Sequence, residues 1–460
     1  MTARRLLFVF HWLVVGGEET EVRLLAQHLR PDWSLDVVVC HHRPEMPDQT
    51  HLQLAELGIP VDSTPYGLCD EQVVDHLAAV LPAYDVVVAC QGVPFVHPAL
   101  QRLGARGDHR PPLIEHGGLV SEALTGPKDL TARYVGVCAS IRDAAASRML
   151  ERPQDAMEIP SMVDLGEFAG DRASDRADAR REWGLADDVP VIGWVGRLDR
   201  KKRVEDVLSA AALLAEERPE AQWVIVGGPN FFYPEHEGVL QELADRLGLG
   251  GRLRFLGDRT DVPRLLAGMD ALVWLSEGEG MPHVLAEAGA AALPVVVRRD
   301  NGSEQQVVDG VSGLFVPKRD APAVTEALVH LIDDPALRRR LGSALRRTVE
   351  ERYAVEVVLP QWRSLLDQLA HRRAPARGRA RTICGWRTGR PVVAVSLTVL
   401  TVLTVLTATP RAGPTGCAES AAGSPNSGWP RCVPSAEQIF PRATPRATRR
   451  RRASPTATSC

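Results

Sequence analysis

The sequence predicts an α/β protein made of two Rossmann-like domains whose parallel sheets face each other across a cleft. Short runs of valine, isoleucine and leucine alternate with amphipathic stretches in one block that ends near residue 165 and in another that begins near residue 189. Continuous apolar strands between helices are typical of parallel strands that helices cover on both faces. The length of 460 residues is also too great for one small hydrophobic core.

The first domain is expected over residues 1–165 and contains five apolar runs that indicate strands. The first run follows two arginines, as in a secretion signal. It passes into the polar stretch GGEETE without a small-residue cleavage site, so we expect a buried strand there. Amphipathic stretches of helical period separate several of the runs. The predicted strands are 6–10, 35–39, 85–89, 113–115 and 134–138, and the predicted helices are 18–29, 71–81 and 141–150.

A linker and a second domain follow. Residues 166–188 are charged, rich in alanine and glycine, and without an apolar run, which predicts the linker. The second domain is expected over 189–350, and a closing helix within 351–370 is expected to pack back across both domains. The predicted strands are 189–195, 222–226, 252–256, 271–275 and 294–297, and the predicted helices are 204–215, 236–247, 262–267, 284–291, 321–333, 335–349 and 355–369.

The last part of the chain has a different composition. Residues 371–460 hold 15 arginines against Glu419 and Glu437, a balance of +13. Because the whole chain carries −4, residues 1–370 carry −17. We expect this basic, low-complexity tail to be disordered, or to be an out-of-frame reading. A membrane span by its Thr-rich apolar segment 391–409 is the alternative, which the segment is barely long enough to provide.

Charge and cysteine usage exclude some classes of protein. An acidic body without a basic stripe argues against a nucleic-acid partner. The eight cysteines form no CxxC pair and no metal-ligand spacing, which suits a reducing cytoplasm. No D-x-D pair occurs, so we expect no metal ion and no cofactor at the site. Cytoplasmic localisation is expected, with peripheral membrane contact left open.

Three strand ends of the second domain offer groups for phosphate or allow a ligand to approach closely. The carboxyl edge of a parallel sheet is where such domains bind ligands. The segment GRLDRKKR follows the strand at 189–195 and places Arg197 and Lys202 before a helix, where cations and free N–H groups favour a diphosphate. Gly227 and Gly257 end the next two strands and permit close approach by a ligand. Each feature taken alone is equally consistent with a solvated loop or a tight turn.

A fourth strand end carries carboxylates, in the segment SEGEGMPHVLAEAGA. Pro282 fits the first position of a helix, which puts His283 and Glu287 one turn apart on one face. Glu279 precedes that helix, so Glu279 and Glu287 can approach one ligand from two sides. Carboxylates accept hydrogen bonds from vicinal hydroxyls, as in a sugar or a ribose. Glu277 is at most a neighbour of the site. Cations, glycines and carboxylates at consecutive ends of one sheet therefore predict a nucleotide-sugar site.

These motifs, in this order and spacing, resemble the retaining family 4 glycosyltransferases of the GT-B fold, also called glycosyl transferases group 1. The resemblance runs over most of residues 1–370. GRLDRKKR is similar to the family's GRL-x3-K-G, with Arg203 where glycine is common. EGMPHVLAEAGA is similar to the E-x7-E motif, and GSEQQVVDGVSGLFVP to the stretch that follows it. GGE at 16–18 resembles the N-terminal glycine loop, and IPSMVD resembles IPNGVD with Ser161 in place of asparagine.

The resemblance implies roles for individual residues. Arg197 and Lys202 would bind the donor diphosphate, Glu279 the donor sugar and Glu287 the ribose. The remaining assignments place backbone N–H groups near the phosphates (Gly16, Gly17), a histidine near the reacting sugar (His116), further donor-binding positions (Gly227, Gly257, Gly280, Met281) and groups that close the donor pocket (Ser303, Glu304). His116 taken alone is equally consistent with a satisfied loop histidine.

The expected function is transfer of a hexose from a UDP-, GDP- or ADP-sugar to a glycan, lipid or small-molecule acceptor, with retention of configuration and without metal. First-domain loops are expected to choose the acceptor. Three alternatives remain open: a sugar-nucleotide epimerase, a phosphorylase on the same fold, and a catalytically silent scaffold in polysaccharide assembly.

Overall fold

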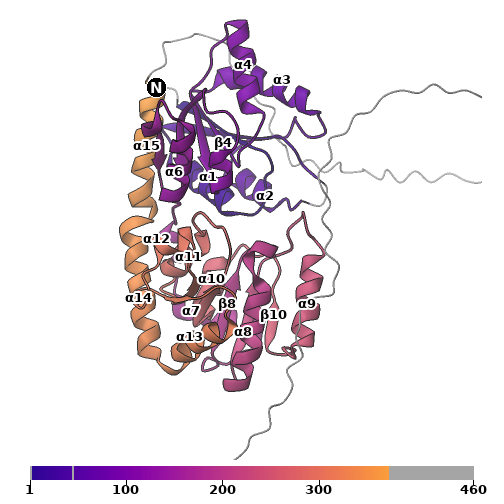
Figure 1. Ribbon diagram of the computed structural model, residues 1–460, viewed down its shortest axis with the longest axis vertical. Coiled ribbons are helices and arrows are strands. Elements are labelled where there is room, and N and C mark those ends of the chain that lie inside the picture. The colour runs from indigo at the N-terminus through magenta and orange to yellow at the C-terminus, as the bar shows by residue number, and fades with distance from the viewer. Residues whose placement is uncertain (1–2, 44–45, 372–460) are drawn as a thin grey trace, which may run out of the picture. The chain divides into compact units, whose positions relative to one another are not determined.

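The structure is a computed structural model that describes residues 3–43 and 46–371 (Figure 1). The tail predicted over 371–460, with its apolar segment 391–409, lies outside the described residues apart from His371. Within the described ranges, no helix is both long enough and apolar enough to cross a membrane.

The first domain is a parallel sheet of seven strands in the order β3-β2-β1-β4-β5-β6-β7. The five predicted strands are confirmed, and two short strands that were not predicted, β3 and β7, complete the edges. The strands are β1 (Arg4–Phe10), β2 (Trp33–Val39), β3 (Val61–Asp62), β4 (Val86–Cys90), β5 (Leu113–Gly117), β6 (Thr131–Gly136) and β7 (Ala156–Glu158). The helices between them are α1 (Gly17–His28), α2 (Gln49–Glu56), α3 (Asp70–Val80), α4 (Val96–Arg106), α5 (Val120–Leu124) and α6 (Ala139–Arg148).

Helices cover both faces of this sheet, which is why β4 is apolar at every position and β1 is apolar from Leu6 to Phe10. Successive side chains of a strand point to opposite faces. In β1, Leu6 and Phe8 join the core on one face, whereas Leu7 and Val9 join a separate core on the other. A strand buried on both sides cannot alternate apolar and polar residues.

The second domain repeats this plan with six parallel strands in the order β10-β9-β8-β11-β12-β13. Its five predicted strands are also confirmed. The strands are β8 (Val191–Val195), β9 (Gln222–Val226), β10 (Leu253–Phe255), β11 (Ala271–Trp274), β12 (Val295–Arg298) and β13 (Leu314–Val316). The helices are α8 (Val204–Glu217), α9 (His236–Arg246), α10 (Val262–Gly268), α11 (His283–Ala290), α12 (Asn301–Gln306), α13 (Ala321–Asp333) and α14 (Pro335–Arg352).

The segment expected to be a linker, 166–188, contains a helix, α7 (Arg172–Trp183). Asp171 caps its start, and the helix packs against α10. Arg180 is buried, donates to the carbonyl oxygen of Gly268 at 3.0 Å and forms an ion pair with Asp270 at 2.7 Å. Because buried Arg180 shares these contacts with only two buried apolar residues, Ala179 and Trp183, hydrophobic periodicity gives little sign of the helix.

The last described helix, α15 (Val355–Ala370), returns to the first domain. Trp362 and Leu366 are fully buried in the core beneath the first sheet. The chain passes between the domains twice, and the two passages are paired, because Val163 and Ala354 form a parallel bridge. Figure 1 shows α14 beside the second domain and α15 beside the first.

Candidate functional site

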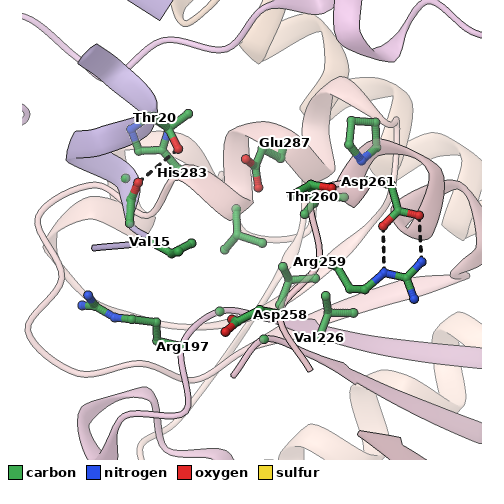
Figure 2. A pocket seen from close by; sticks show the side chains of 18 of the residues that line it. Val15, Thr20, Arg197, Val226, Asp258, Arg259, Thr260, Asp261, His283 and Glu287 are labelled. Carbon is green, nitrogen blue, oxygen red and sulfur yellow. Dashed lines mark hydrogen bonds and ion pairs between the residues drawn. The ribbon is translucent and has the colours of Figure 1, made fainter. Parts of the chain in front are cut away.

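A cavity of about 890 Å³ lies between the carboxyl edges of the two sheets. Its first-domain wall comes from the segment after β1, with Gly16 and Gly17, and from α1. Its second-domain wall comes from the ends of β8, β9 and β11 and from α11. Figure 2 shows Arg197 and Glu287 approaching this space from opposite sides. Eight of the predicted residues line it: Gly16, Gly17, Arg197, Lys202, Gly227, Glu279, Met281 and Glu287.

Lys202 and Glu279 form an ion pair in the wall of the cavity. The Nζ atom of Lys202 lies 2.8 Å from Oε1 of Glu279 and 4.6 Å from the ring centroid of Trp274. The hydroxyl of Ser276 donates to the same carboxylate oxygen at 2.7 Å. Burial lowers the pKa of Lys202, although its ion pair with Glu279 opposes this. Burial also favours the neutral acid of Glu279, but Lys202 and Lys201 outweigh that effect and lower its pKa.

Arg197 is placed differently from Lys202. Within the described part of the chain it forms no ion pair with a carboxylate. Its guanidinium group borders the cavity in Figure 2. Arg197 acts on Glu19 only through space, so its N–H donors stay available for a planar anionic group such as a phosphate.

Glu287 and His283 lie one turn apart on α11, as predicted, and both line the cavity (Figure 2). Burial and the nearby carboxylate of Glu167 raise the pKa of Glu287 to about 7. Burial lowers the pKa of His283 to about 4, so this ring is neutral. Pro282 is the residue before the helix, with φ of −66°, rather than its first residue as the sequence indicated.

Glycines allow the backbone to approach the cavity closely. A Cβ atom on Gly17 would lie 2.5 Å from the His283 ring, across the gap between the domains. A Cβ atom on Gly227 would lie 1.8 Å from the carbonyl oxygen of Gly196, and the φ of +128° also disfavours any other residue. Gly16 precedes α1, whose first N–H groups have no partner within the helix and therefore suit an anion.

A second cavity of about 280 Å³ adjoins the first on its first-domain side and contains His116 and Gly280. It shares Gly16, Arg197 and Glu279 with the larger cavity. The Nδ1 atom of His116 lies 3.0 Å from Oε1 of Glu18. Burial lowers the pKa of His116, although Glu21 and Glu122 oppose the shift. A neutral imidazole therefore faces the place where the two cavities meet.

Three predicted residues line neither cavity. Gly257 pairs with Gly227 in an isolated bridge. It therefore supports a residue of the wall of the larger cavity without lining the cavity itself. Ser303 is buried, and its hydroxyl donates to the carbonyl oxygen of Arg298 at 2.8 Å. Glu304 pairs with Arg299 at 2.8 Å. Glu277, expected to be only a neighbour, pairs with Arg298 at 2.9 Å.

Other residues that line the cavities were not predicted. Asp258, Arg259 and Asp261 follow β10, and the guanidinium of Arg259 pairs with Asp261 in Figure 2. Ligands bind at the carboxyl ends of parallel strands, which is why Gly257 was predicted, and these three residues follow the same strand. Trp12 and the pair Phe231–Phe232 line the smaller cavity. No motif distinguishes them, because they are loop residues of two different domains.

One group among the described residues could hold a metal ion: Glu18, Cys90 and His116, whose ligand atoms lie within 4.8 Å of one another. However, burial and the adjacent Glu18 raise the pKa of the Cys90 thiol, which disfavours the thiolate that binds metals. The imidazole of His116 already contacts Glu18. The chemistry of these donors fits a hydrogen-bonded cluster better than a metal site.

The sequence profile of the glycosyl transferases group 1 family matches residues 175–348. These residues belong to that family. A D-inositol 3-phosphate glycosyltransferase from Corynebacterium urealyticum is 31% identical over 234 residues, which cover 50% of this chain and 54% of that protein. A GDP-mannose-dependent monoacylated alpha-(1-6)-phosphatidylinositol monomannoside mannosyltransferase from Corynebacterium glutamicum is 30% identical over 209 residues, which cover 44% and 53%. The matches thus span about half the length of these relatives.

A likeness in fold to a solved structure extends over both domains. The crystal structure of Anabaena HepE in complex with UDP-glucose is similar to this chain with a TM-score of 0.67 and 21% identity, covering 79% of this chain and 99% of HepE. With its two parallel sheets and their helices, the chain has the GT-B fold, as predicted. The motif residues of the second domain, Arg197 to Glu287, lie within the part that matches the group 1 profile.

Proposed function

We propose that the protein transfers a hexose from a nucleotide diphosphate sugar to an acceptor on the first-domain side, with retention of anomeric configuration and without metal. The observation that carries the proposal is the placement of Arg197, Lys202, Glu279 and Glu287 around one cavity. Two cations suit the diphosphate, and two carboxylates suit the hydroxyl groups of sugar and ribose. The glycine loop of the first domain faces them across the gap.

The donor class is supported by the relatives. The C. glutamicum relative is named as GDP-mannose-dependent, and HepE is described in complex with UDP-glucose. Both donors share the diphosphate and the ribose, which are the parts that Arg197, Lys202 and Glu287 would contact. The base and the sugar differ between these proteins, so the proposal names the class of donor only.

The reaction breaks the bond between the anomeric carbon and the diphosphate oxygen, and it forms a bond from the acceptor oxygen to the same carbon. Negative charge grows on the departing diphosphate, where Arg197 and Lys202 would stabilise it. Retention follows if the acceptor attacks from the face that the diphosphate leaves. The proton of the acceptor hydroxyl then passes to a diphosphate oxygen. The polar groups of His116 and Glu279 border this region.

A thermal-shift screen with UDP, GDP, ADP and their sugar conjugates tests the donor class, because a bound nucleotide stabilises the folded protein by mass action. Hydrolysis of the identified donor in the absence of acceptor then reports turnover. We expect Arg197→Ala to lower it by about 10²-fold. Arg200→Ala is the matched control, because Arg200 is an exposed arginine of the same turn that lines neither cavity. Wild-type turnover in Lys202→Ala/Glu279→Ala, or no stabilisation by any nucleotide, would overturn the proposal.

A further inference from the structure

The smaller cavity contains more acidic groups than its basic groups can balance. Among the residues that the structure describes, its lining includes four glutamates, one arginine and no lysine: Glu18, Glu19, Glu122, Glu279 and Arg197. Glu279 is balanced by Lys202, and Arg197 attracts Glu19. Glu18 and Glu122 form no ion pair with a lysine or an arginine among the described residues. Two carboxyl groups thus face this cavity without a cationic partner.

The smaller cavity also contains a hydrogen-bonding atom without a partner, on His116. His116 is 4% exposed and lines the cavity, and its Nε2 atom has no hydrogen-bond partner in the described structure. If Nδ1 donates its proton to Glu18, then Nε2 of the neutral ring is an acceptor. The cavity therefore presents one acceptor without a partner, Nε2 of His116, beside two carboxyl groups that accept hydrogen bonds from backbone N–H groups but have no cationic partner.

The mouth of the cavity is aromatic. Trp12, from the segment after β1, lies 6.3 Å from Phe231 and 6.4 Å from Phe232, measured between ring centroids. Phe232 is 49% exposed although it is a large apolar residue. The guanidinium group of Arg43 already lies over the rings of Trp12 and Phe232, at 5.3 and 5.8 Å. Aromatic faces attract cations and also pack against the C–H faces of sugar rings.

We propose that the smaller cavity binds an acceptor with an amine, a polyhydroxylated ring whose ammonium group lies between Glu18, Glu122 and His116. The inference rests on the proposed transferase function, because it assigns the second substrate of the same site. An ammonium group has three donors and a positive charge, so it can donate to Nε2 of His116 and supply the cation that Glu18 and Glu122 lack. A phosphate has acceptors only, so it can neither donate to Nε2 of His116 nor supply a cation to the two carboxyl groups. The raised pKa values of Glu18, about 8, and Glu122, about 7, reflect the same missing cation, since burial without a cationic partner favours the neutral acids.

The test compares three cyclitols of one ring size that differ in charge: 2-deoxystreptamine, myo-inositol and myo-inositol 1-phosphate. Binding to the full chain is measured by calorimetry in the presence of whichever nucleotide diphosphate stabilises the protein. We expect the diamine to bind about tenfold more tightly than myo-inositol, and the phosphate most weakly. Glu18→Gln and Glu122→Gln should each reduce the preference for the diamine, with binding of myo-inositol unchanged within about twofold.

Glu151→Gln is the matched control, because Glu151 is exposed and lines neither cavity. It should keep the full preference. The inference is overturned if the diamine does not bind, if the phosphate binds at least as tightly as the diamine, or if both Gln variants keep the preference. Nucleotide stabilisation in each variant shows that it is folded. A wild-type chain that no nucleotide stabilises would contradict the proposed function itself, whereas nucleotide binding without discrimination among the cyclitols contradicts only the acceptor assignment.

Discussion

The ammonium group of Lys202 lies 2.8 Å from the carboxylate of Glu279, and each side chain is less than 15% exposed, at 12% and 13%. The two residues follow β8 and β11, which are neighbours in the second sheet. A pair this deeply buried stabilises the fold only while both members are present, because a single remaining charge has no solvent to replace its partner.

Removing one member should therefore harm stability more than removing both. We expect Lys202→Met to lower the free energy of unfolding by up to about 3 kcal/mol, because the buried Glu279 keeps only the more exposed Lys201, at 3.8 Å, as a cationic partner. The double variant Lys202→Met/Glu279→Gln should recover most of that loss without recovering donor turnover. Urea denaturation and donor hydrolysis measure the two effects. A double variant no more stable than Lys202→Met would contradict this account.

Trp274 is expected to position Lys202. Its ring lies 4.6 Å from the ammonium group and stacks on Trp194 at 5.9 Å. Trp274→Leu removes a cation–π contact of about 0.5–2 kcal/mol and frees the lysine to move. We expect kcat for donor hydrolysis to fall about tenfold with little change in KM. Trp274→Phe should restore much of the loss, and a change confined to KM would contradict a positioning role.

Donor affinity should depend on pH through Glu287. Its pKa of about 7 lies above the ordinary value of 4.5, so the carboxylate is protonated as pH falls below 7. A ribose donates hydrogen bonds to the ionised form, so the Kd for a nucleotide sugar should rise up to about tenfold between pH 8 and pH 6. Nucleotide sugars are the right probe because, unlike free diphosphates, they do not titrate there. Calorimetry of Glu287→Gln should show weaker binding without this slope.

Stability should depend on pH through Glu18. Its folded pKa of about 8 exceeds the ordinary 4.5, so the folded state holds the proton more tightly than the unfolded state. This contribution to stability is complete below about pH 4.5 and is lost as pH rises through 8. Glu18→Gln should be more stable than the wild type by about 1–3 kcal/mol at pH 8 and equal to it at pH 5. Thermal unfolding at both pH values, with Glu151→Gln as control, measures the difference.

Trp362 on α15 should be important for the stability of the first domain. It is 1% exposed, and its indole N–H donates to Oε1 of Glu21 at 3.2 Å. Trp362→Ala should cost about 3–5 kcal/mol, because it opens a cavity and removes the donor to Oε1 of the buried Glu21, whose other oxygen keeps the N–H of Met162. Trp362→Phe keeps most of the packing and should cost less. Equal losses in the two variants would show that only the hydrogen bond matters.

Much of the fold was predictable, because strands buried on both faces must be apolar throughout. The ten predicted strands are confirmed for that reason. The short edge strands β3 and β7 bury too little surface to leave such a pattern. Helix α7 was missed because Arg180, rather than a leucine, anchors it. Periodicity records apolar burial and does not record buried arginines.

The candidate site was predictable where it follows one sheet. Arg197, Lys202, Glu279 and Glu287 lie at strand ends of the second domain, and topology brings such ends together. The placement of Ser303 behind the wall depends on its bond to the Arg298 carbonyl, which no spacing shows. The aromatic mouth could not be predicted either, because Trp12 and Phe231 meet only when two domains are folded and placed.

The return of the chain through α15 has a consequence for biosynthesis. The ribosome releases residues 1–165 first, yet the core beneath the first sheet is completed only by Trp362 and Leu366, near the end of the described chain. The second domain, whose sheet ends with β13, can close its own core earlier. The first domain is thus the first to be synthesised and the last to be completed. A message truncated before codon 355 would leave the apolar face of the first sheet without the helix that covers it.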